Sequence, residues 1–576
     1  MTPDAAPATP ALASPPEAPA PSRPGRLPLA AAGGVAALGL AVVAYLYGLN
    51  HAFIPSIGDE PLYLQIARNT LASGRLLPLV SDTGITNTKP PLLFWQGIAA
   101  ARLAGLELAA LRLPSVLLTF ATAALAGALA ARLAGRRRVG VLAALVFLAF
   151  RSSMQYGRPF LTNPGEALFL FLPLVLLSRR ERTGPGLAVA CGASMGVAAL
   201  YKSFAVVLPG TLALALVLLH RSGGRPGVLL RRHGRFLAGA AAVGLAVFGL
   251  WFVADPRPDL VLSQFVLGEN GAKFRAAGLL AGLVSGPYPL WRIWLGPVLN
   301  AGLLAPVVVG LLVDLWRRRR AIPAEEAELW LYVLAFLLFY SVPTQRQENY
   351  LLPASGALAV LLALRWEAIG SGWFRAPLAA LAAAAAALPL LESSVERAAG
   401  ARLWTPATLA IPVALAGLAF AAALHARLAR ALLPALSLGA LVAITSFLAP
   451  FSRPFSPAVA RELRGRTALF PDRFQREHEL YRFLVPGADV QGYPCPSGPV
   501  PCALPADAGG TYLAALEPSA SAPPGYAVLE DRPHLRSRHS AAEIRAIAEG
   551  DLGLLLERLV LLRPTPAGLA LRGGGT

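Results

Sequence analysis

Apolar runs of about 20 residues recur along most of the chain, and short polar segments separate them. Runs of this length predict α-helices that cross a hydrocarbon core about 30 Å thick. We predict about thirteen spans, at residues 27–49, 111–131, 139–151, 165–177, 186–201, 203–220, 236–254, 291–315, 329–343, 350–364, 376–391, 405–424 and 431–449. The pattern therefore indicates an all-α polytopic membrane protein.

Two segments of the first long loop, residues 50–110, have a different pattern. Residues 62–74 follow the Asp59-Glu60 pair after one proline and mix apolar and polar positions at helical spacing. Residues 89–106 are apolar, but they open with Pro-Pro and are interrupted by Arg102. The first segment is predicted to form a helix that lies on the membrane, and the second a helix that lies at the interface or re-enters the membrane.

Arginine clusters occur in alternate loops and predict the orientation of the chain. They lie near residues 23–26, 132–138, 179–182, 221–235, 317–320, 365–375 and 427–430. Basic loops of membrane proteins face the cytoplasm. We therefore predict a membrane protein with a cytoplasmic N-terminus and a C-terminus on the opposite, periplasmic side.

The change of pattern along the chain predicts three parts. Residues 1–26 are rich in Pro and Ala without apolar periodicity, which is typical of a disordered tail. Residues 27–450 contain the predicted spans. Residues 451–576 are more polar, and Ser540 to Pro564 reads as a helix followed by a strand. The last part is predicted to be a small periplasmic α/β domain.

Composition agrees with a membrane protein. The chain is 55% hydrophobic and 14% charged, whereas soluble proteins carry about a quarter charged residues. The net charge of +19 does not indicate nucleic-acid binding, because the arginines lie in short loops without interleaved aromatic residues. Cys495 and Cys502 are seven residues apart and could pair in an oxidising compartment.

The predicted periplasmic loops contain isolated charged and polar residues among prolines and aromatic residues. Charged side chains near the membrane are costly and are candidates for function. The candidates are Asp59, Glu60, Lys89, Asn163, Glu166, Lys202, Glu269, Asn270, Arg275, Arg346 and Tyr350. No spacing of His or Cys indicates a metal site, so no cofactor is predicted, and a divalent metal stays open without being indicated.

Six short stretches carry a family resemblance. They are "DEPLYLQIARNTLASG" from Asp59, "TKPPLLFWQ" from Thr88, "ALRLPSVL" from Ala110, "LYKSF" from Leu200, "FVLGENGAKF" from Phe265 and "SVPTQRQENYLLP" from Ser341. In this order, the chain resembles the GT-C superfamily of polyprenyl-phosphate-sugar-dependent glycosyltransferases. Within it, the chain is similar to the bacterial lipid A aminoarabinose transferases and to protein O-mannosyltransferases. It carries Leu62 and Thr88 where the aminoarabinose transferases usually carry Arg and Glu, differences that concern the sugar rather than the reaction class.

The resemblance implies a GT-C-like fold and an inverting transfer at the periplasmic face. The donor would be a polyprenyl-phosphate-linked sugar such as an undecaprenyl derivative. The acceptor would be a hydroxyl of a lipid, glycan or protein, as in lipid A modification or protein O-glycosylation of the cell envelope. Membrane lipids are expected partners and nucleic acid is not. Which sugar and which acceptor stay open, as do the oligomeric state and the role of the C-terminal domain.

The chemistry requires a base for the acceptor proton and cations for the leaving phosphate. Asp59, Glu60 and Glu166 are the catalytic candidates, with Asp59 preferred as the base. Whether Asn163 or Glu166 stands for the family's second acidic residue stays open. The candidates for binding the donor phosphate and sugar are Lys89, Lys202, Glu269, Asn270, Arg275, Arg346 and Tyr350. The alternatives are a non-catalytic protein that binds lipid-linked sugars and a lipid or sugar transporter (flippase).

Overall fold

The computed structural model describes residues 29–54, 58–180, 182–271, 283, 288–496, 502–505, 511–517, 524–536 and 539–565. The predicted tail at 1–26 lies outside these residues. The N-terminal half contains α1 (Leu29–Leu46), α2 (Glu60–Ala72), α3 (Leu92–Ala104), α4 (Leu108–Ala134), α5 (Arg137–Ala149), α6 (Arg151–Gly157), α7 (Asn163–Leu177), α8 (Pro185–Tyr201), η1 (Phe204–Val206), α9 (Val207–Arg221) and α10 (Pro226–Ala254).

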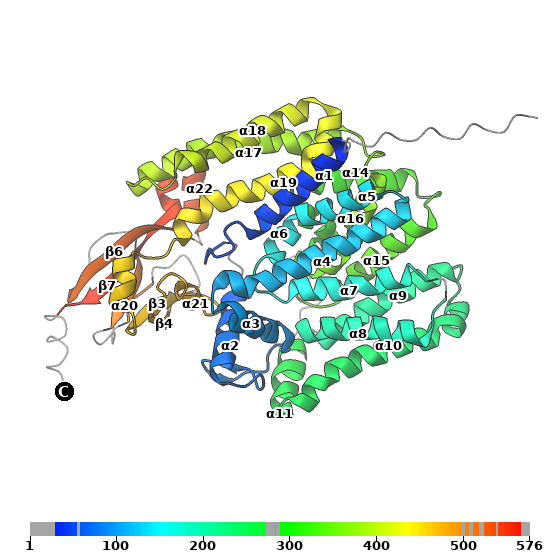
Figure 1. The fold of residues 1–576 in the computed structure, drawn as a ribbon, viewed down its shortest axis with the longest axis horizontal. Coiled ribbons are helices and arrows are strands. Elements are labelled where there is room, and N and C mark those ends of the chain that lie inside the picture. The colour runs from blue at the N-terminus through cyan, green and yellow to red at the C-terminus, as the bar shows by residue number, and fades with distance from the viewer. Residues whose placement is uncertain are drawn as a thin grey trace, which may run out of the picture.

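The rest of the helical part begins with α11 (Pro258–Leu260) and η2 (Val261–Asn270), which is a π-helix. It continues with α12 (Leu290–Trp294), α13 (Gly296–Ala301), η4 (Gly302–Leu304), α14 (Ala305–Arg317), α15 (Ala324–Tyr340), η5 (Glu348–Leu351), α16 (Leu352–Arg365), α17 (Gly372–Ala399), α18 (Pro406–Leu424), α19 (Ala426–Leu448) and η6 (Ala449–Ser452). These elements form one large helical bundle (Figure 1).

Each of the predicted apolar runs coincides with a helix or a group of consecutive helices. In the described part of the chain, seven helices are long and apolar enough to cross a membrane, or eight if α5 and α6, bent by 63°, form one span. The bend lies at Phe150, whose extended backbone interrupts the helix. These helices confirm a multi-pass membrane protein, while the number thirteen stays a prediction.

The first long loop folds into helices at one end of the bundle, next to the C-terminal sheet (Figure 1). Helix α2 has a proline in its first turn and ends just before Gly74, whose φ of +72° suits glycine. A short hairpin, β1 (Val80–Ser81) and β2 (Gly84–Ile85), leads to α3. Helix α3 has 13 residues, or about 20 Å of length, which is too short to span a bilayer.

A small sheet follows the bundle, as the sequence predicted. Its strands are β3 (Thr467–Asp472), β4 (Asp489–Pro494), β5 (Tyr512–Glu517), β6 (Tyr526–Leu535) and β7 (Leu556–Pro564), in the order β4-β3-β5-β7-β6. Strand β3 runs parallel to β4 and β5, and β7 runs antiparallel to β5 and β6. Short helices α20 (Pro457–Leu463), α21 (His478–Tyr481), α22 (Ala541–Ala548) and η7 (Leu552–Leu555) accompany it.

Two predictions for the C-terminal part are confirmed in detail. The segment from Ser540 to Pro564 forms α22 and then β7, and Ser540 caps α22 through a capping box with Glu543. Cys495 and Cys502 are joined by a disulfide, with their Cα atoms 5.1 Å apart. A disulfide is typical of an oxidising compartment.

Helices α4 and α5 approach so closely that only glycine fits between them. A Cβ atom on Gly140 would lie 2.5 Å from the carbonyl oxygen of Gly127 and 2.7 Å from the Cβ of Ala131. Small residues at such contacts let helix backbones meet, which is the main way that membrane helices associate. The contact holds α5 against α4, the helix that also carries Arg112.

We predict that Gly140→Ala destabilises the bundle by roughly 1–3 kcal/mol, because the added methyl group forces the two backbones apart. Gly249→Ala in α10 is the matched control, since no atom lies within 4 Å of its added Cβ. Thermal unfolding of both variants in detergent measures the difference. Equal melting temperatures would contradict the close α4–α5 contact.

Candidate active site

The candidate residues come from distant parts of the chain and lie at helix ends. Asp59 precedes the first residue of α2, and Glu166 lies in the first turn of α7. Lys202 follows α8, and Glu269 and Asn270 end the π-helix η2. Lys89 lies just before α3, and Tyr350 lies in η5. Arg275 lies outside the described residues.

One ion pair joins the first loop to η2. The Lys89 ammonium lies 2.6 Å from Glu269 Oε1, across 180 residues of sequence, and both side chains stay partly exposed. The backbone N–H of Asn87 also donates to Gln264 Oε1, at 2.7 Å. These contacts fix the Lys-Pro-Pro segment against a π-helix, a rare element that is frequent at functional sites.

A second group of polar side chains joins α7, α8, α15 and η5. Glu166 is fully buried and accepts a hydrogen bond from the Tyr340 hydroxyl at 3.3 Å. Its other carboxylate oxygen lies 3.7 Å from Lys202 Nζ. Lys202 also lies over the ring of Tyr350, 5.6 Å from the centroid, within the range of a cation–π contact. The lysine thus lies between a carboxylate and an aromatic face.

Two tyrosines connect these groups to Asp59. Tyr63 donates to Asp59 Oδ2 at 3.4 Å. Burial raises the pKa of Tyr63 well above its usual value, and the charges of Asp59 and Glu269 raise it further. Burial also raises the pKa of Tyr350, and the charges of Glu166, Tyr288, Asp59 and Glu269 raise it further. Asp59 and Glu269 thus act on both tyrosines, and Glu166 acts on Tyr350 as well.

Asp59 and Glu60 are adjacent in sequence but lie in different surroundings. Asp59 is exposed. Glu60 is 1% exposed and forms a bidentate ion pair with Arg112, with N–O distances of 2.8 and 2.7 Å. Glu60 Oε1 also accepts the backbone N–H of Phe160, at 2.7 Å. Both carboxylate oxygens of Glu60 are therefore occupied, which favours a structural role over the catalytic role that the sequence analysis considered.

Arg112 is the partner that the sequence analysis did not assign to Glu60. It is fully buried, and its Nη1 donates to the backbone carbonyls of Leu49, His51 and Ile54. Arg112 thus joins the end of the first span to the start of α2. The signal in the sequence was an arginine inside an apolar run, which requires a buried acceptor.

Arg158, at the end of α6, also holds backbone segments together through hydrogen bonds. It is fully buried and donates to the carbonyl oxygens of Tyr45 and Tyr47, at 3.2 and 2.5 Å. The two arginines together fix the segment that follows α1. The position of Asp59 therefore depends on charged groups that do not reach the exposed part of the site.

Asn270 and Arg346 hold backbone segments in place. Asn270 is buried, accepts from the Ser203 hydroxyl at 2.8 Å and donates to the Phe265 carbonyl at 2.9 Å. It thereby joins the residue after Lys202 to η2. Arg346 is 1% exposed and donates to the carbonyls of Ser341 and Tyr288, at 3.0 and 3.3 Å. These contacts position the turn that leads to Tyr350.

Glu348 forms a further charged group beside Tyr350. Arg292 donates to it at 2.5 Å, and Arg151 lies 3.6 Å away. Burial raises the pKa of Glu348, but the hydrogen bond and charge of Arg292 together with the charge of Arg151 outweigh burial and leave the pKa below its usual value. Glu348 is therefore ionised at neutral pH and anchors η5 to α12 and α6.

The C-terminal part contacts the outer side of α2. Arg68 of α2 forms a bidentate pair with the buried Glu479 of α21, at 2.7 and 3.1 Å. Asp82 accepts from Gln65 and Asn69, also on α2, at 2.6 and 2.7 Å. Helix α2 is thus fixed between the bundle and the C-terminal sheet. Within the described residues, no group of three or more His, Cys, Asp or Glu side chains could hold a metal ion.

Comparison with known proteins places the chain beside membrane sugar transferases. Residues 88–252 match the family described as Dolichyl-phosphate-mannose-protein mannosyltransferase. The undecaprenyl phosphate-alpha-4-amino-4-deoxy-L-arabinose arabinosyl transferase 1 of Sodalis glossinidius (strain morsitans) is 29% identical over 317 residues, 53% of this chain and 54% of the relative. A second transferase of this kind, from Proteus mirabilis (strain HI4320), is 27% identical over 333 residues, 56% of this chain and 57% of the relative. The chain spans about half the length of these curated relatives.

Solved structures show the same fold. ArnT from Cupriavidus metallidurans in the apo state has a TM-score of 0.58 at 19% identity, over 80% of this chain and 86% of that one. The same protein bound to undecaprenyl phosphate has a TM-score of 0.57 at 20% identity, over 79% and 85%. These matches confirm the predicted GT-C-like fold and the similarity to aminoarabinose transferases.

We predict that Glu60→Gln destabilises the fold by roughly 3–5 kcal/mol, because it leaves the buried Arg112 without a counter-charge. Arg112→Gln is expected to have a similar effect. The double variant is expected to lose less than the sum of the two single variants. Thermal unfolding of the four proteins measures this coupling.

Asp59→Asn is the matched control for these variants, since Asp59 is exposed and adjacent to Glu60. It is expected to unfold at the temperature of the unchanged protein. Fully additive losses in the double variant would show that Glu60 and Arg112 do not act as a pair.

Proposed function

We propose that this protein is an integral-membrane glycosyltransferase that moves a sugar from a polyprenyl-phosphate donor to a hydroxyl acceptor with inversion. The proposal rests on three neighbouring features: the exposed Asp59, the Lys89–Glu269 ion pair, and Lys202 between Glu166 and Tyr350. Tyr350 interacts electrostatically with the carboxylates of all three. Together these features combine an exposed carboxylate with two cations at one end of a membrane bundle. The arabinosyl transferase relatives and the ArnT structure with bound undecaprenyl phosphate support the same reaction class.

In this proposal Asp59 is the general base. It is exposed, and within the described residues its only side-chain partner is the Tyr63 hydroxyl, at a long 3.4 Å. A carboxylate oxygen is therefore left to accept a proton from the acceptor hydroxyl. The hydrogen bond from Tyr63 orients the carboxylate without neutralising it.

The reaction is a single displacement. The acceptor oxygen forms a bond to the anomeric carbon, and its proton passes to Asp59. The bond between the anomeric carbon and the phosphate oxygen breaks, and its electron pair leaves with polyprenyl phosphate. The leaving phosphate gains negative charge, which Lys89 and Lys202 stabilise. One displacement inverts the configuration at the anomeric carbon.

The buried carboxylates have positioning roles in this scheme. Glu166 holds Lys202 from one side while Tyr350 covers it from the other. Glu60 fixes the start of α2 through Arg112, which keeps Asp59 in place. Arg346 and Asn270 position the segments on which Tyr350 and Lys202 lie, and Arg275 stays a candidate ligand of the phosphate.

We also propose that the reaction takes place at the periplasmic face of a bacterial inner membrane. The arginine clusters lie in the loops opposite to those that contain Asp59, Lys89 and Lys202, and basic loops face the cytoplasm. Residues 27–450 would form the catalytic membrane domain in this arrangement. Residues 451–576 would form a periplasmic domain that braces α2.

We predict that Asp59→Asn lowers the initial rate of transfer by about 10²- to 10⁴-fold, because it removes the base. Donor binding and the melting temperature are expected to be unchanged. Lys89→Ala is expected to weaken donor binding as well as turnover, since the lysine contacts the phosphate before and during the reaction. The measurement is the initial rate at which radiolabelled sugar passes from the lipid-linked donor to acceptor molecules in vesicles. It is made at several donor concentrations.

Asp259→Asn is the control, because Asp259 is an exposed aspartate that pairs with Arg257 in another loop of the same predicted side. Its rate is expected to match that of the unchanged protein. A folded Asp59→Asn protein with full turnover would remove Asp59 as the base. Donor binding without any transfer by the unchanged protein, or sugar movement without bond formation, would instead favour a binding protein or a transporter.

The orientation is tested by cysteine labelling. Ala20→Cys and Ala520→Cys are introduced separately into a chain whose three native cysteines are replaced by serine. We predict that residue 520 reacts with an impermeant thiol reagent in intact cells and that residue 20 reacts only after permeabilisation. Labelling of both positions from one side would show an even number of spans instead of thirteen. Helix α3, which is not counted as a span, would then be the first segment to re-examine.

A further inference from the structure

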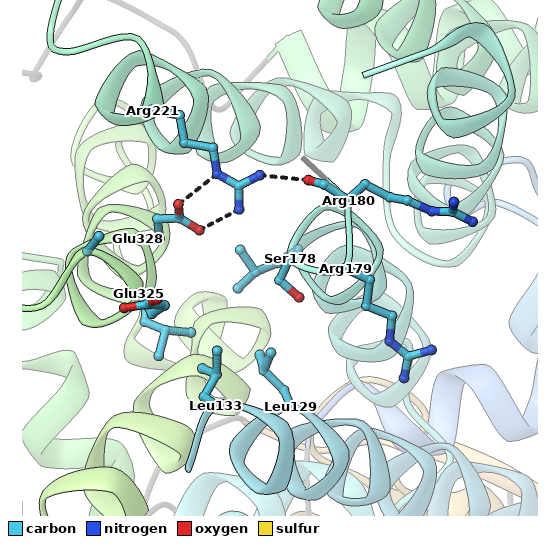
Figure 2. Close-up of a pocket in the computed structure, with 11 residues that line it drawn as sticks. Leu129, Leu133, Ser178, Arg179, Arg180, Arg221, Glu325 and Glu328 are labelled. Carbon is cyan, nitrogen blue, oxygen red and sulfur yellow. Dashed lines mark hydrogen bonds and ion pairs between the residues drawn. The ribbon is translucent and has the colours of Figure 1, made fainter. Parts of the chain in front are cut away.

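Asp59 contrasts with an ion pair at the far end of the bundle, where the partners are complete. There, Arg221 of α9 donates to both carboxylate oxygens of Glu328, at 2.7 and 2.6 Å, and to the Arg180 carbonyl at 3.1 Å (Figure 2). The carboxylate of Asp59 is exposed instead, and among the described residues only the Tyr63 hydroxyl donates to it. The residues around Asp59 therefore determine what can approach an acid that stays open.

The C-terminal part of the chain reaches Asp59 through Phe474, in the loop between β3 and α21. A Cβ atom on Gly58 would lie 2.7 Å from Cε1 and 3.3 Å from Cδ1 of the Phe474 ring. The ring therefore packs on the backbone of the residue that precedes Asp59. Phe474 is nevertheless 44% exposed. An open aromatic surface thus lies beside the exposed acid.

The loop that carries Phe474 has an unusual backbone. Gln475 and Arg476 have positive φ angles, of 50° and 65°, and no other residue except glycine has one in the part of the chain that the structure describes. A positive φ is unfavourable for residues with a side chain. Such residues are concentrated at functional sites, where the surrounding contacts impose the conformation. Two of them in succession therefore suggest a function for this loop.

Contacts on both sides of the loop impose this backbone. Before it, Arg473 forms a bidentate pair with Glu557 of β7, at 3.3 and 3.1 Å. After it, the backbone N–H of Glu477 donates to the side chain of Asp472, the last residue of β3, at 3.1 Å. The loop is thus fixed at both ends, while Phe474 between them stays exposed.

The loop also lies at the edge where parallel sheets commonly bind ligands. Strand β3 is parallel to β4 and β5, and it lies between them in the strand order. The chain therefore passes from β3 to a neighbour on one side and then to a neighbour on the other. Ligands of open sheets bind beyond the carboxyl ends of the strands at such a reversal. The loop begins at that end of β3, and the following α21 packs beside α2 (Figure 1).

The proposed displacement gives this place a role. The acceptor and the leaving phosphate must lie on opposite sides of the anomeric carbon. Lys89 and Lys202 belong to the phosphate side, whereas Asp59 takes the proton on the acceptor side. The Phe474 ring packs on the residue just before Asp59. It therefore lies beside the place where the acceptor hydroxyl meets its base.

We propose that the loop from Arg473 to Glu477 forms the acceptor side of the site, and that the exposed face of Phe474 packs against the acceptor. The inference rests on the proposed function, because it concerns the acceptor of that reaction. An aromatic ring offers a broad apolar surface. Phe474 thus favours an acceptor that has a carbon framework beside its hydroxyl group over water. It is a positioning residue, and Asp59 remains the base.

The test measures transfer of radiolabelled sugar by the full-length chain from an undecaprenyl-phosphate-linked donor to a detergent extract of bacterial cell envelopes. The amounts of extract and of donor are varied separately, and thermal unfolding checks the fold of each variant. Phe474→Ala removes the ring, and Phe474→Tyr keeps it. Ile544→Ala is the matched control, because Ile544 is 58% exposed and lies on α22 of the same C-terminal part.

We expect Phe474→Ala to raise the amount of extract that gives the half-maximal rate roughly tenfold, because part of an aromatic contact is lost. The corresponding amount of donor is expected to stay the same, since the ring does not contact the phosphate. Phe474→Tyr and Ile544→Ala are expected to behave like the unchanged protein. Phe474→Leu keeps an apolar group on Gly58 without the flat ring. It is expected to give an intermediate value, and it replaces Phe474→Ala if that variant does not fold.

Three results would overturn the role of Phe474. A lower maximal rate with an unchanged requirement for extract would show that the ring only holds Gly58 and Asp59 in place. An equal rise in the requirement for donor would place Phe474 on the donor side. Equal behaviour of Phe474→Ala and Ile544→Ala would remove the loop from the site. Absence of any transfer by the unchanged protein would instead contradict the proposed function itself.

Discussion

The structure of the active-site side depends on the buried ion pair between Glu60 and Arg112. A charge taken out of water costs several kcal/mol unless every lone pair and proton finds a partner. Here Arg112 donates to both oxygens of Glu60 and to three backbone carbonyls, and Glu60 also accepts the N–H of Phe160. One pair therefore fixes the end of the first span, the start of α2, and the chain just before α7. Asp59 precedes α2 and Glu166 lies in the first turn of α7. The distance between these two acids therefore depends on the Glu60–Arg112 ion pair.

The sequence predicted the elements well because a bilayer imposes a strong pattern. A span requires a long apolar run, and all thirteen predicted runs coincide with helices. The candidate residues also proved to be neighbours, as in the Lys89–Glu269 and Glu166–Lys202 pairs. Their proximity could be inferred because loops on one side of a bundle meet at the same surface.

The division of roles within the site could not be predicted from the sequence. Asp59 and Glu60 are adjacent, and residues one apart on a helix point about 100° from each other. Asp59 is therefore exposed while Glu60 faces Arg112. The sequence alone does not tell which of the two acids is buried. Arg112 lies 52 residues from Glu60, so their pairing depends on how α2 folds back against α4. The π-helical geometry of η2, which places Glu269 and Asn270, depends equally on tertiary contacts.

Both lysines of the site are paired with carboxylates, and this arrangement suits the proposed reaction. The pairs keep the lysines ordered when no donor is present, because Lys89 contacts Glu269 and Lys202 contacts Glu166. In the proposed reaction, a donor phosphodiester carries one negative charge and must compete with these carboxylates, so the lysines bind it less strongly than they bind the charge that develops on the leaving phosphate. As the bond to the anomeric carbon breaks, the phosphate approaches two negative charges and competes better. The lysines then stabilise the transition state more than the bound donor, and that difference is what accelerates a reaction.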